Sequence, residues 1–513
     1  MRLVLTFALF FASLLCHAAS RFDFPLPPGP MPVGFRVVQQ YDYARIFLGD
    51  VDPVTGKANT GERARPVQTL VWYPATRSGQ AMRYGDYLAL IGTELDFTRS
   101  KEEARAAADV FIRSEYFSES GPEQGRRELD GLVRARRDAA AAAGRFPVVI
   151  YAPSISAPAA ENPDLCEYLA SHGYIVIASP SIGLRSREMP SKLEGAETHA
   201  ADIAFLIGYA RTLPHADAGQ VGVVGYSWGG IANVLAAAKD SRIKALVNLD
   251  GSVRYYPELM AAAKYAAPER FTTPMLFVAA RPLDLEALAG RGKPAASFLN
   301  DMKYADLYKL TMHPMEHFAF SSTYLRFASD QRFNQYARSE VNRAHGWTVE
   351  YTKRFLDAYL KNDGSARAYL GAQPATHGIP AHAATMEVRL AAMTLPSRER
   401  FAAELARQGF RNAHAVYRQV YGQEKDARLP EAELNAWGYA LLHREENSAA
   451  IEVFRLATEL YPASANAFDS LAEGLARSGD KDGAIQNYRR VLALDPGSEN
   501  ARQQLTALGA PAT

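Results

Sequence analysis

The pattern of hydrophobic and polar residues divides the chain into a part that alternates strands with helices and a part that is helical throughout. Up to about residue 360, short runs of Val, Ile and Leu with little alternation are separated by amphipathic stretches. Such runs are typical of strands buried on both faces of a sheet. The alternation predicts a mostly parallel sheet covered by helices. The expected strands are residues 67–74, 145–154, 174–180, 221–226, 244–250 and 273–280.

Other segments do not follow this alternation. Residues 85–144 are polar, alanine-rich and helical in pattern, and we expect them to form a cap rather than plain surface decoration. Residues 281–310 interrupt the pattern between the last expected strand and a pair of histidines. The amphipathic stretch 350–361 is expected to close the first domain. The segment 362–398 is rich in Ala, Gly and Pro, which predicts a linker.

A repeat occupies the end of the chain. Residues 435–464 align with residues 468–498 at a constant offset of 34, so that Trp437 corresponds to Leu471 and Pro462 to Pro496. This period, with Pro after the second helix, resembles the tetratricopeptide repeat. Two repeats bury little core, so further packing is needed from a flanking helix or from the first domain. The repeats are expected to serve either as a passive stabilising element or as a docking surface for a protein partner.

The first twenty residues have the pattern of a secretory signal peptide. One arginine precedes an apolar stretch over residues 3–15, and the small residues Ala18 and Ala19 follow. The stretch is short for a membrane anchor. We therefore expect residues 1–19 to be removed and the mature protein, without a transmembrane span, to be periplasmic or secreted. Cleavage would leave Cys166 as the only cysteine, which excludes an internal disulfide.

Composition narrows the class of protein. A chain of 513 residues is too long for one ordinary core, which predicts two or more domains. Hydrophobic residues make up 48% and charged residues 22%, as in folded globular proteins. The formal net charge of +1 argues against a nucleic-acid-binding protein, which normally has a strong basic excess. No zinc, redox or nucleotide-binding motif is present, so no metal or cofactor is expected.

The stretch Gly225-Tyr226-Ser227-Trp228-Gly229 carries the chemistry that the sequence shows most clearly. It lies between an expected strand and an expected helix, the context of the G-x-S-x-G nucleophile elbow. Glycines are needed because larger side chains would collide with the adjoining strand and helix. The turn would project the Ser227 hydroxyl above the sheet, next to a helix N-terminus that favours negative charge. We therefore expect Ser227 to be a catalytic nucleophile.

A serine nucleophile needs a histidine base, and His313 and His317 are the candidates. Both follow the expected strands, where the base of such a fold is found. Aromatic residues directly after His317 can hold its loop, whereas Pro314 follows His313, so we favour His317 and keep His313 as the alternative. A third histidine, His345, lies in a polar segment and is expected at the surface.

Two aspartates compete for the role of orienting the histidine. Asp250 ends an expected strand directly after the helix of the elbow, whereas Asp284 lies several residues into a loop. A strand end is the more rigid platform, which favours Asp250.

Residues 145–320 resemble the platelet-activating factor acetylhydrolase family, α/β-hydrolases related to dienelactone hydrolase. The resemblance rests on "FPVVIYAPSISA", "CEYLASHGYIVIASP", "GVVGYSWGG", "LVNLDG" and "HFAF". In that family the acid follows the serine by about two dozen residues, and Phe stands three places after the histidine. The resemblance therefore implies Asp250 and His317. The elbow motif predicts the N–H of Trp228 as one oxyanion donor, and the resemblance implies Ile155 as the second, although a His-Gly pair usual in that loop is absent here.

These patterns and the resemblance together give the expected domains. They are a signal peptide (1–19), an α/β-hydrolase domain (20–361) with the cap insertion (85–144), a linker (362–398) and a helical tetratricopeptide-repeat region (399–513). We expect an exported serine hydrolase that cleaves lipid or short-chain carboxylic esters through an acyl-serine intermediate. The same triad also serves amide, peptide or thioester hydrolysis, and a non-catalytic interaction protein built on the repeats is a further alternative. The expected partners are an ester substrate and a protein bound by the repeats.

Overall fold

The computed structural model describes residues 20–511, apart from 52–55, 282–297, 392–395 and 423–427. The expected signal peptide and Asp284 lie outside the described residues. The chain divides into two compact units, Met1–Met393 and Thr394–Thr513. Within the described residues, every helix is too short or too polar to cross a lipid bilayer.

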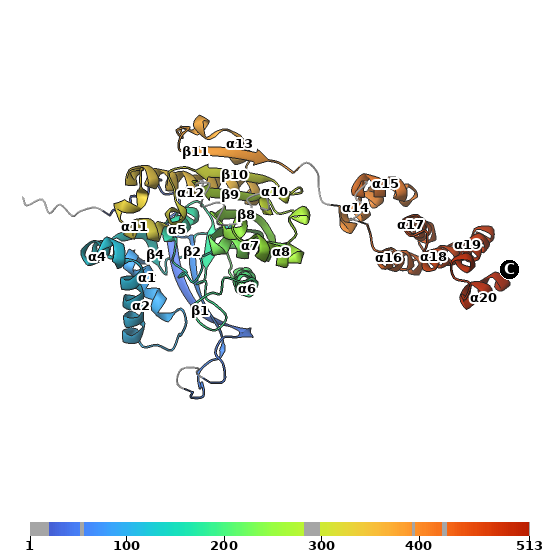
Figure 1. Cartoon of the computed structure of the whole chain (residues 1–513), viewed down its shortest axis with the longest axis horizontal. Helices are drawn as coiled ribbons and strands as arrows, with labels where there is room; N and C mark the ends of the chain where they lie inside the picture. The colour runs from blue at the N-terminus through green and yellow to red at the C-terminus, as the bar shows by residue number, and fades with distance from the viewer. Residues whose placement is uncertain (1–19, 52–55, 282–297, 392–395, 423–427, 512–513) are drawn as a thin grey trace, which may run out of the picture. The chain divides into compact units, whose positions relative to one another are not determined.

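An eleven-stranded mixed sheet forms the centre of the first unit (Figure 1). Its six central strands, from β6 to β10, are parallel neighbours, and β2, β1 and β11 join them in antiparallel pairs. In spatial order the strands are β11 (Ala384–Arg389), β10 (Leu307–Met312), β9 (Met275–Ala280), β8 (Ile243–Leu249), β7 (Ala216–Tyr226), β5 (Phe146–Ala152), β6 (Ile175–Ala178), β2 (Ala64–Pro74), β1 (Val33–Ile46), β4 (Leu132–Arg137) and β3 (Gln80–Arg83).

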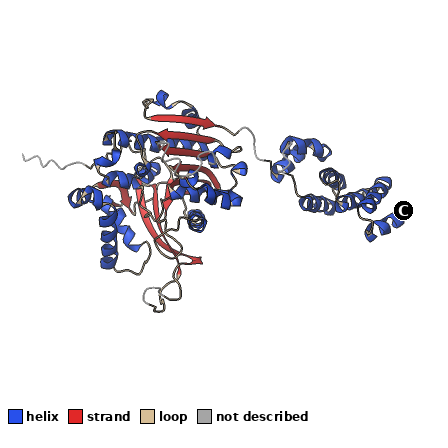
Figure 2. Cartoon of the chain, viewed as in Figure 1, coloured by secondary structure: helices blue, strands red, loops and turns tan. Residues whose placement is uncertain are grey.

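Helices cover both faces of this sheet (Figure 2). Helices α5 and α12 contribute to one hydrophobic core, and α6 and α7 contribute to the other. Alternate residues of each central strand enter the two cores: Val149 and Tyr151 of β5 face the first, and Val148 and Ile150 face the second. Because both faces of the central strands are buried, polar and apolar residues do not alternate along them in the sequence. The helices of the first unit are α1 (Tyr84–Leu88), α2 (Lys101–Glu115), α3 (Phe117–Ser120), α4 (Pro122–Asp130), α5 (Pro163–Ser171), α6 (Leu193–Ala210), α7 (Trp228–Lys239), α8 (Pro257–Ala262), α10 (Phe298–Asp301), α11 (Ser322–Phe327), α12 (Arg338–Leu360) and α13 (Gly364–Gly371).

The segment 85–144, expected to be a helical cap, holds α2, α3 and α4 but also strand β4, which pairs with β1. Its helices pack on α11 through aromatic side chains. The rings of Tyr116 and Phe327 stack with their centroids 5.2 Å apart, and both belong to a small separate hydrophobic cluster. The insertion is therefore fixed to the segment that follows His317.

The segment 362–398, expected to be a linker, is instead structured over most of its length. Asp363 caps α13 by accepting hydrogen bonds from the N–H groups of Ser365 and Ala366 at 2.8 and 3.2 Å. Strand β11 then pairs antiparallel with β10 along all six of its residues. The physical reason is that β10 would otherwise be a sheet edge with unpaired N–H and C=O groups. The expectation of a linker over residues 364–389 is therefore wrong.

The second unit is entirely helical in its described residues (Figure 2). Helices α16 and α18 begin 34 residues apart, at Glu431 and Ala465, and α17 and α19 also begin 34 residues apart. Corresponding helices are joined by side-chain hydrogen bonds, such as Ser470 Oγ to Asn435 Oδ1 at 2.6 Å. The helices are α14 (Arg398–Gln408), α15 (Ala413–Tyr421), α16 (Glu431–His443), α17 (Asn447–Leu460), α18 (Ala465–Arg477), α19 (Lys481–Leu494) and α20 (Glu499–Ala507).

Candidate active site

Ser227 lies in a sharp turn between β7, which ends at Tyr226, and α7, which begins at Trp228. Its φ of 52° and ψ of −114° are unusual for a residue with a side chain and indicate local backbone strain. Gly229 is required next to it, because a Cβ there would lie 2.1 Å from the carbonyl oxygen of Ala152. The geometry is that of the nucleophile elbow expected from the sequence.

The structure brings Ser227, His317 and Asp250 together in one hydrogen-bonded chain. His317 Nε2 lies 2.9 Å from Ser227 Oγ, and His317 Nδ1 lies 2.6 Å from Asp250 Oδ2. The other oxygen of Asp250 accepts a hydrogen bond from the N–H of Ala280 at 3.1 Å. Asp250 is only 1% exposed, and a buried carboxylate beside Nδ1 favours the Nδ1–H tautomer of His317, in which Nε2 can accept a hydrogen bond from Ser227.

The parallel sheet explains why residues distant in sequence meet here. Ser227 follows β7, Asp250 follows β8, and His317 begins the 3-10 helix η6 (His317–Phe320) after β10. These strands point in the same direction, so their carboxyl ends lie at one edge of the sheet. Functional residues of open α/β sheets gather at that edge.

The alternative histidines lie elsewhere. His313 Nε2 lies 3.4 Å from Thr385 Oγ1 of β11, and its N–H donates to Ala383 O, so it belongs to the outer edge of the sheet. His345 was expected at the surface, but this expectation is wrong, because α12 turns it inward and leaves it 1% exposed. Its Nδ1 lies 3.0 Å from the carbonyl oxygen of Ala319.

The main chain around His317 is held by two side chains that sequence reasoning did not single out for this role. The Tyr226 hydroxyl donates to the carbonyl oxygen of His317 at 2.9 Å. His345 holds Ala319, two residues further on, and burial lowers its pKa, which keeps the ring neutral. Tyr226 lies inside the elbow motif, so its position was available from the sequence, whereas the polar neighbours of His345 concealed its burial.

The two expected oxyanion donors lie on segments that contact each other. Trp228 is the first residue of α7, and the first N–H groups of a helix have no intrahelical acceptor. Ile155 lies in the loop after β5, and among the described residues no acceptor is found for its N–H. The loop touches the first turn of α7, because a Cβ on Gly229 would lie 2.8 Å from Pro153 O. The helix dipole adds favourable potential for negative charge beside Ser227.

A second set of missed residues ties this loop to the histidine segment. The side-chain amide of Asn162 donates to Phe320 O at 2.8 Å and accepts from Ser322 N–H at 3.0 Å. The hydroxyl of Ser321 donates to the carbonyl oxygen of Glu161 at 2.8 Å. The sequence "PAAENPD" shows two polar residues among small ones before a helix, a weak signal that identifies neither contact. Within the described residues, no group of three or more His, Cys, Asp or Glu could hold a metal ion.

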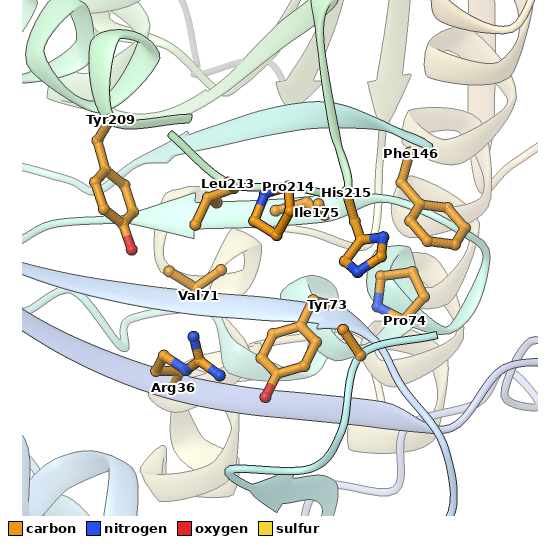
Figure 3. A pocket seen from close by; sticks show the side chains of 11 residues that line it. Arg36, Val71, Tyr73, Pro74, Phe146, Ile175, Tyr209, Leu213, Pro214 and His215 are labelled. Carbon is orange, nitrogen blue, oxygen red and sulfur yellow. The ribbon is translucent and has the colours of Figure 1, made fainter. Parts of the chain in front are cut away.

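Two cavities differ in their relation to this site. A cavity of about 270 Å³ lies beside the insertion and is lined by Tyr116, Tyr324 and by Phe318, the residue directly after His317. A second cavity of about 150 Å³ lies near the amino ends of the parallel strands, where β5 and β6 begin with Phe146 and Ile175 (Figure 3). Only the first cavity borders the segment that carries His317.

A comparison with sequence profiles of protein families identifies the family of the first unit. The sequence profile of the X-Pro dipeptidyl-peptidase (S15) family matches residues 94–378, which is more than half of the chain. The chain belongs to the S15 family. The matched range includes Ser227, Asp250 and His317, together with the helices α2 to α4. The resemblance to platelet-activating factor acetylhydrolases remains a prediction.

Two further comparisons place this S15 family member among α/β-hydrolases. A Methylorubrum extorquens protein, provisionally named a carboxymethylenebutenolidase, is 26% identical over 189 residues, which are 34% of this chain. The alignment spans 62% of that relative, less than two thirds of its length. The structure of a ferulic acid esterase from Streptomyces cinnamoneus superposes with a TM-score of 0.50 at 21% identity and covers 72% of this chain and 99% of the esterase. At that identity the similarity shows the shared fold.

Proposed function

We propose that the protein is a serine hydrolase of carboxylic esters in which Ser227 is the nucleophile, His317 the general base and acid, and Asp250 the residue that orients His317. The observation that carries the proposal is the continuous chain from Ser227 Oγ through both ring nitrogens of His317 to Asp250, with distances of 2.9 and 2.6 Å. Both distances are within the range needed for proton transfer. The names of the relatives, an esterase and a butenolide hydrolase, support the ester class.

The proposed reaction has two steps with balanced proton transfers. Ser227 Oγ forms a bond to the ester carbonyl carbon while its proton moves to His317 Nε2. The N–H groups of Trp228 and Ile155 stabilise the negative oxygen that develops, and Asp250 stabilises the imidazolium. His317 then gives the proton to the departing alcohol oxygen, which leaves an acyl-serine. Water attacks the acyl carbon, again with His317 as base, and releases the acid and free Ser227.

Peptide hydrolysis is the second candidate, because the matching family profile is that of X-Pro dipeptidyl-peptidases. The triad geometry serves both reactions, and the difference lies in the leaving group and in the substrate pocket. The cavity between the insertion and η6 contains Glu115, Glu119 and Arg332 beside its aromatic side chains. We propose that this cavity, shaped by the cap, receives part of the substrate.

A direct comparison of substrates tests the two candidates. The purified protein is assayed on p-nitrophenyl esters of graded acyl length and on Xaa-Pro p-nitroanilides, with Ser227→Ala as the control for background hydrolysis. We expect ester cleavage to give the higher kcat/KM. A higher kcat/KM on the proline anilides would assign the protein to peptide hydrolysis instead.

We also propose an exported protein with a tetratricopeptide tail that binds a protein partner. The N-terminal residue pattern supports export, and N-terminal sequencing of the envelope fraction tests it. An intact Met1 on cytoplasmic protein would contradict it. The 34-residue offset between α16 and α18 and between α17 and α19 supports the repeat assignment. Affinity capture with residues 394–513 and with the first unit as a paired control tests whether partners bind the tail.

A further inference from the structure

Glu161 is a fully buried residue whose carboxyl group contacts the loop that carries Ile155. It is 0% exposed and follows the loop by a few residues, just before α5. Its Oε2 accepts hydrogen bonds from the N–H of Ser154 at 2.8 Å and from the Tyr151 hydroxyl at 3.1 Å. Its Oε1 accepts a hydrogen bond from the Ser154 hydroxyl. One side chain therefore holds both the backbone and the side chain of the residue before Ile155.

The other supports of this loop act on the C-terminal side of Ile155. Glu94, from the insertion, accepts the N–H of Ala159 at 2.8 Å, and the Ser156 hydroxyl accepts the N–H of Met189 at 2.9 Å. Ser154 is the point of contact on the N-terminal side of Ile155. The peptide unit between Ser154 and Ile155 contains the expected oxyanion donor, so its orientation depends directly on how Ser154 is held.

We propose that Glu161 is a positioning residue for the oxyanion hole, in which its ionised carboxylate holds Ser154 and so directs the N–H of Ile155 toward the carbonyl oxygen of the substrate at Ser227. The inference rests on the proposed hydrolase function. The chemistry of the contacts supports this role. Three donors, two hydroxyls and one N–H, converge on Glu161, and an ionised carboxylate offers only acceptors to them. A protonated carboxyl would be a donor at one oxygen, so that a hydroxyl partner there would have to turn and accept instead of donating.

Glu161 gains or loses its proton in the pH range in which such an enzyme works. Burial raises the pKa of Glu161 to about 7, against the lowering effect of the hydrogen bonds from Ser154 and Tyr151. The positive form of His317 also lowers it. The titratable groups that interact with Glu161 are Tyr151 on β5, Tyr226 at the end of β7, Tyr116 after α2, Tyr324 on α11 and His317 on η6.

The chain offers a matched control in Glu167. This glutamate on α5 is 4% exposed, and burial likewise raises its pKa to about 7. It also accepts three hydrogen bonds, from the Tyr87 hydroxyl and from the N–H groups of Arg134 and Ala135. Its hydrogen-bond partners lie on α1 and β4, and none of them belongs to the loop after β5. Replacing it perturbs the fold as Glu161→Gln does, without touching Ser154.

The test compares Glu161→Gln with Glu167→Gln in the full chain at pH 8. We expect Glu161→Gln to lower kcat by at least about tenfold but less than the roughly 10²–10³-fold cost of removing an oxyanion donor, with KM within about twofold. Glu167→Gln should keep the wild-type kcat. The acid limb of kcat/KM should fall more steeply in the wild type than in Glu161→Gln, because two groups instead of one must lose a proton. Equal kcat in the two variants would overturn the proposal.

Hydrogen exchange separates this inference from the proposed function. The amide exchange of residues 154–157 is measured in the same proteins without substrate, and Glu161→Gln should accelerate it relative to Glu167→Gln. Unchanged exchange overturns the role of Glu161 even in an active enzyme. A wild type that cleaves no substrate and does not react with a fluorophosphonate refutes the hydrolase proposal instead. If Glu161→Gln does not fold, Ser154→Ala removes one donor only and should still lower kcat several-fold at unchanged KM; an unchanged kcat overturns the proposal.

Discussion

Gly225 and Gly229 lie against each other on either side of Ser227, so that a Cβ on Gly225 would be 2.3 Å from the carbonyl oxygen of Gly229. No side-chain movement can relieve this contact, because the atoms that the added Cβ would meet are backbone atoms. The same holds for a Cβ on Gly229, which would meet the carbonyl oxygen of Ala152. The strained turn at Ser227 therefore depends on the absence of two side chains, one before and one after it.

Gly229→Ala should consequently lower both stability and turnover. The added methyl group would lie 2.1 Å from Ala152 O and would push the loop after β5 away from α7. Gly208→Ala is the matched control, because it lies on α6 with open space around it and should stabilise the helix by about 1 kcal/mol. Chemical denaturation and ester turnover are measured for both variants. A Gly229→Ala protein with wild-type turnover would contradict the close approach.

Ser227→Ala should remove nearly all hydrolysis and leave the fold intact. Loss of a triad nucleophile costs roughly 10⁶-fold in kcat in well-studied serine hydrolases, and the small change in volume leaves β7 and α7 undisturbed. Turnover on a short-chain ester, circular dichroism and fluorophosphonate labelling are measured together. A labelled peptide other than the one containing Ser227, or an active variant, would show that the nucleophile is misassigned.

Asp250→Asn should lower turnover by about 10⁴-fold with the geometry preserved, because an amide cannot fix the required tautomer of His317 or stabilise its positive form. Asp284→Asn, at the competing aspartate that lies outside the described residues, should leave turnover near the wild-type level. Both variants are checked by circular dichroism before kinetics. The reverse result would move the orienting role to Asp284.

The stability of the protein should decrease as the pH rises from about 4.5 to about 7, in part through Glu167. The pKa of this carboxyl is near 4.5 when it is exposed and about 7 in the fold. The native state therefore holds the proton more strongly than the unfolded state over this range, and the stabilisation present below pH 4.5 is lost as the pH passes 7. Urea titrations at pH 5 and pH 8 should show that Glu167→Gln removes about 3 kcal/mol of this decrease. Parallel curves for wild type and variant would contradict the shifted pKa.

Two truncations distinguish the observed boundary of the hydrolase unit from the expected one. A fragment of residues 20–393 keeps β11 and the whole triad, and should retain turnover and remain monomeric. A fragment of residues 20–361 lacks α13 and β11, which leaves β10 as an unpaired edge, and should aggregate. Size-exclusion chromatography and ester turnover measure both. Equal behaviour would show that β11 is dispensable.

The sequence predicted most of the strands that are buried on both faces, but it missed the buried strand β10 and the strands that are more exposed. Residues 221–226 and 244–250 are continuous apolar runs and appear as parts of β7 and β8. Strand β1 mixes polar and apolar residues and is largely half-buried or exposed after Phe35, so no apolar run marks it. Strand β11 has three exposed residues at its end and lies among Ala, Gly and Pro, and only its pairing with β10 makes it a strand.

The meeting of Ser227, Asp250 and His317 was more predictable from the sequence than the contacts that support it. The positions of Ser227, Asp250 and His317 follow from a local motif, from strand ends and from chain order, all of which are visible in one dimension. Glu161 and His345 act through contacts with segments that are distant in the sequence or through one backbone group, and neither has a motif. Burial decided both roles, and burial of a single polar residue depends on the three-dimensional packing around it.

The 34-residue spacing of the tail helices has a consequence for how this chain can change in length. Helices α16 and α18 are joined by hydrogen bonds between Tyr439 and Glu473, which are 34 residues apart, and between Asn435 and Ser470, which are 35 residues apart. Duplicating a block of 34 residues would recreate this interface at the junction, whereas a block of another size would break it. We therefore expect the tail to tolerate insertions as whole repeats, so that it can grow in discrete steps while the residues around Ser227 stay the same.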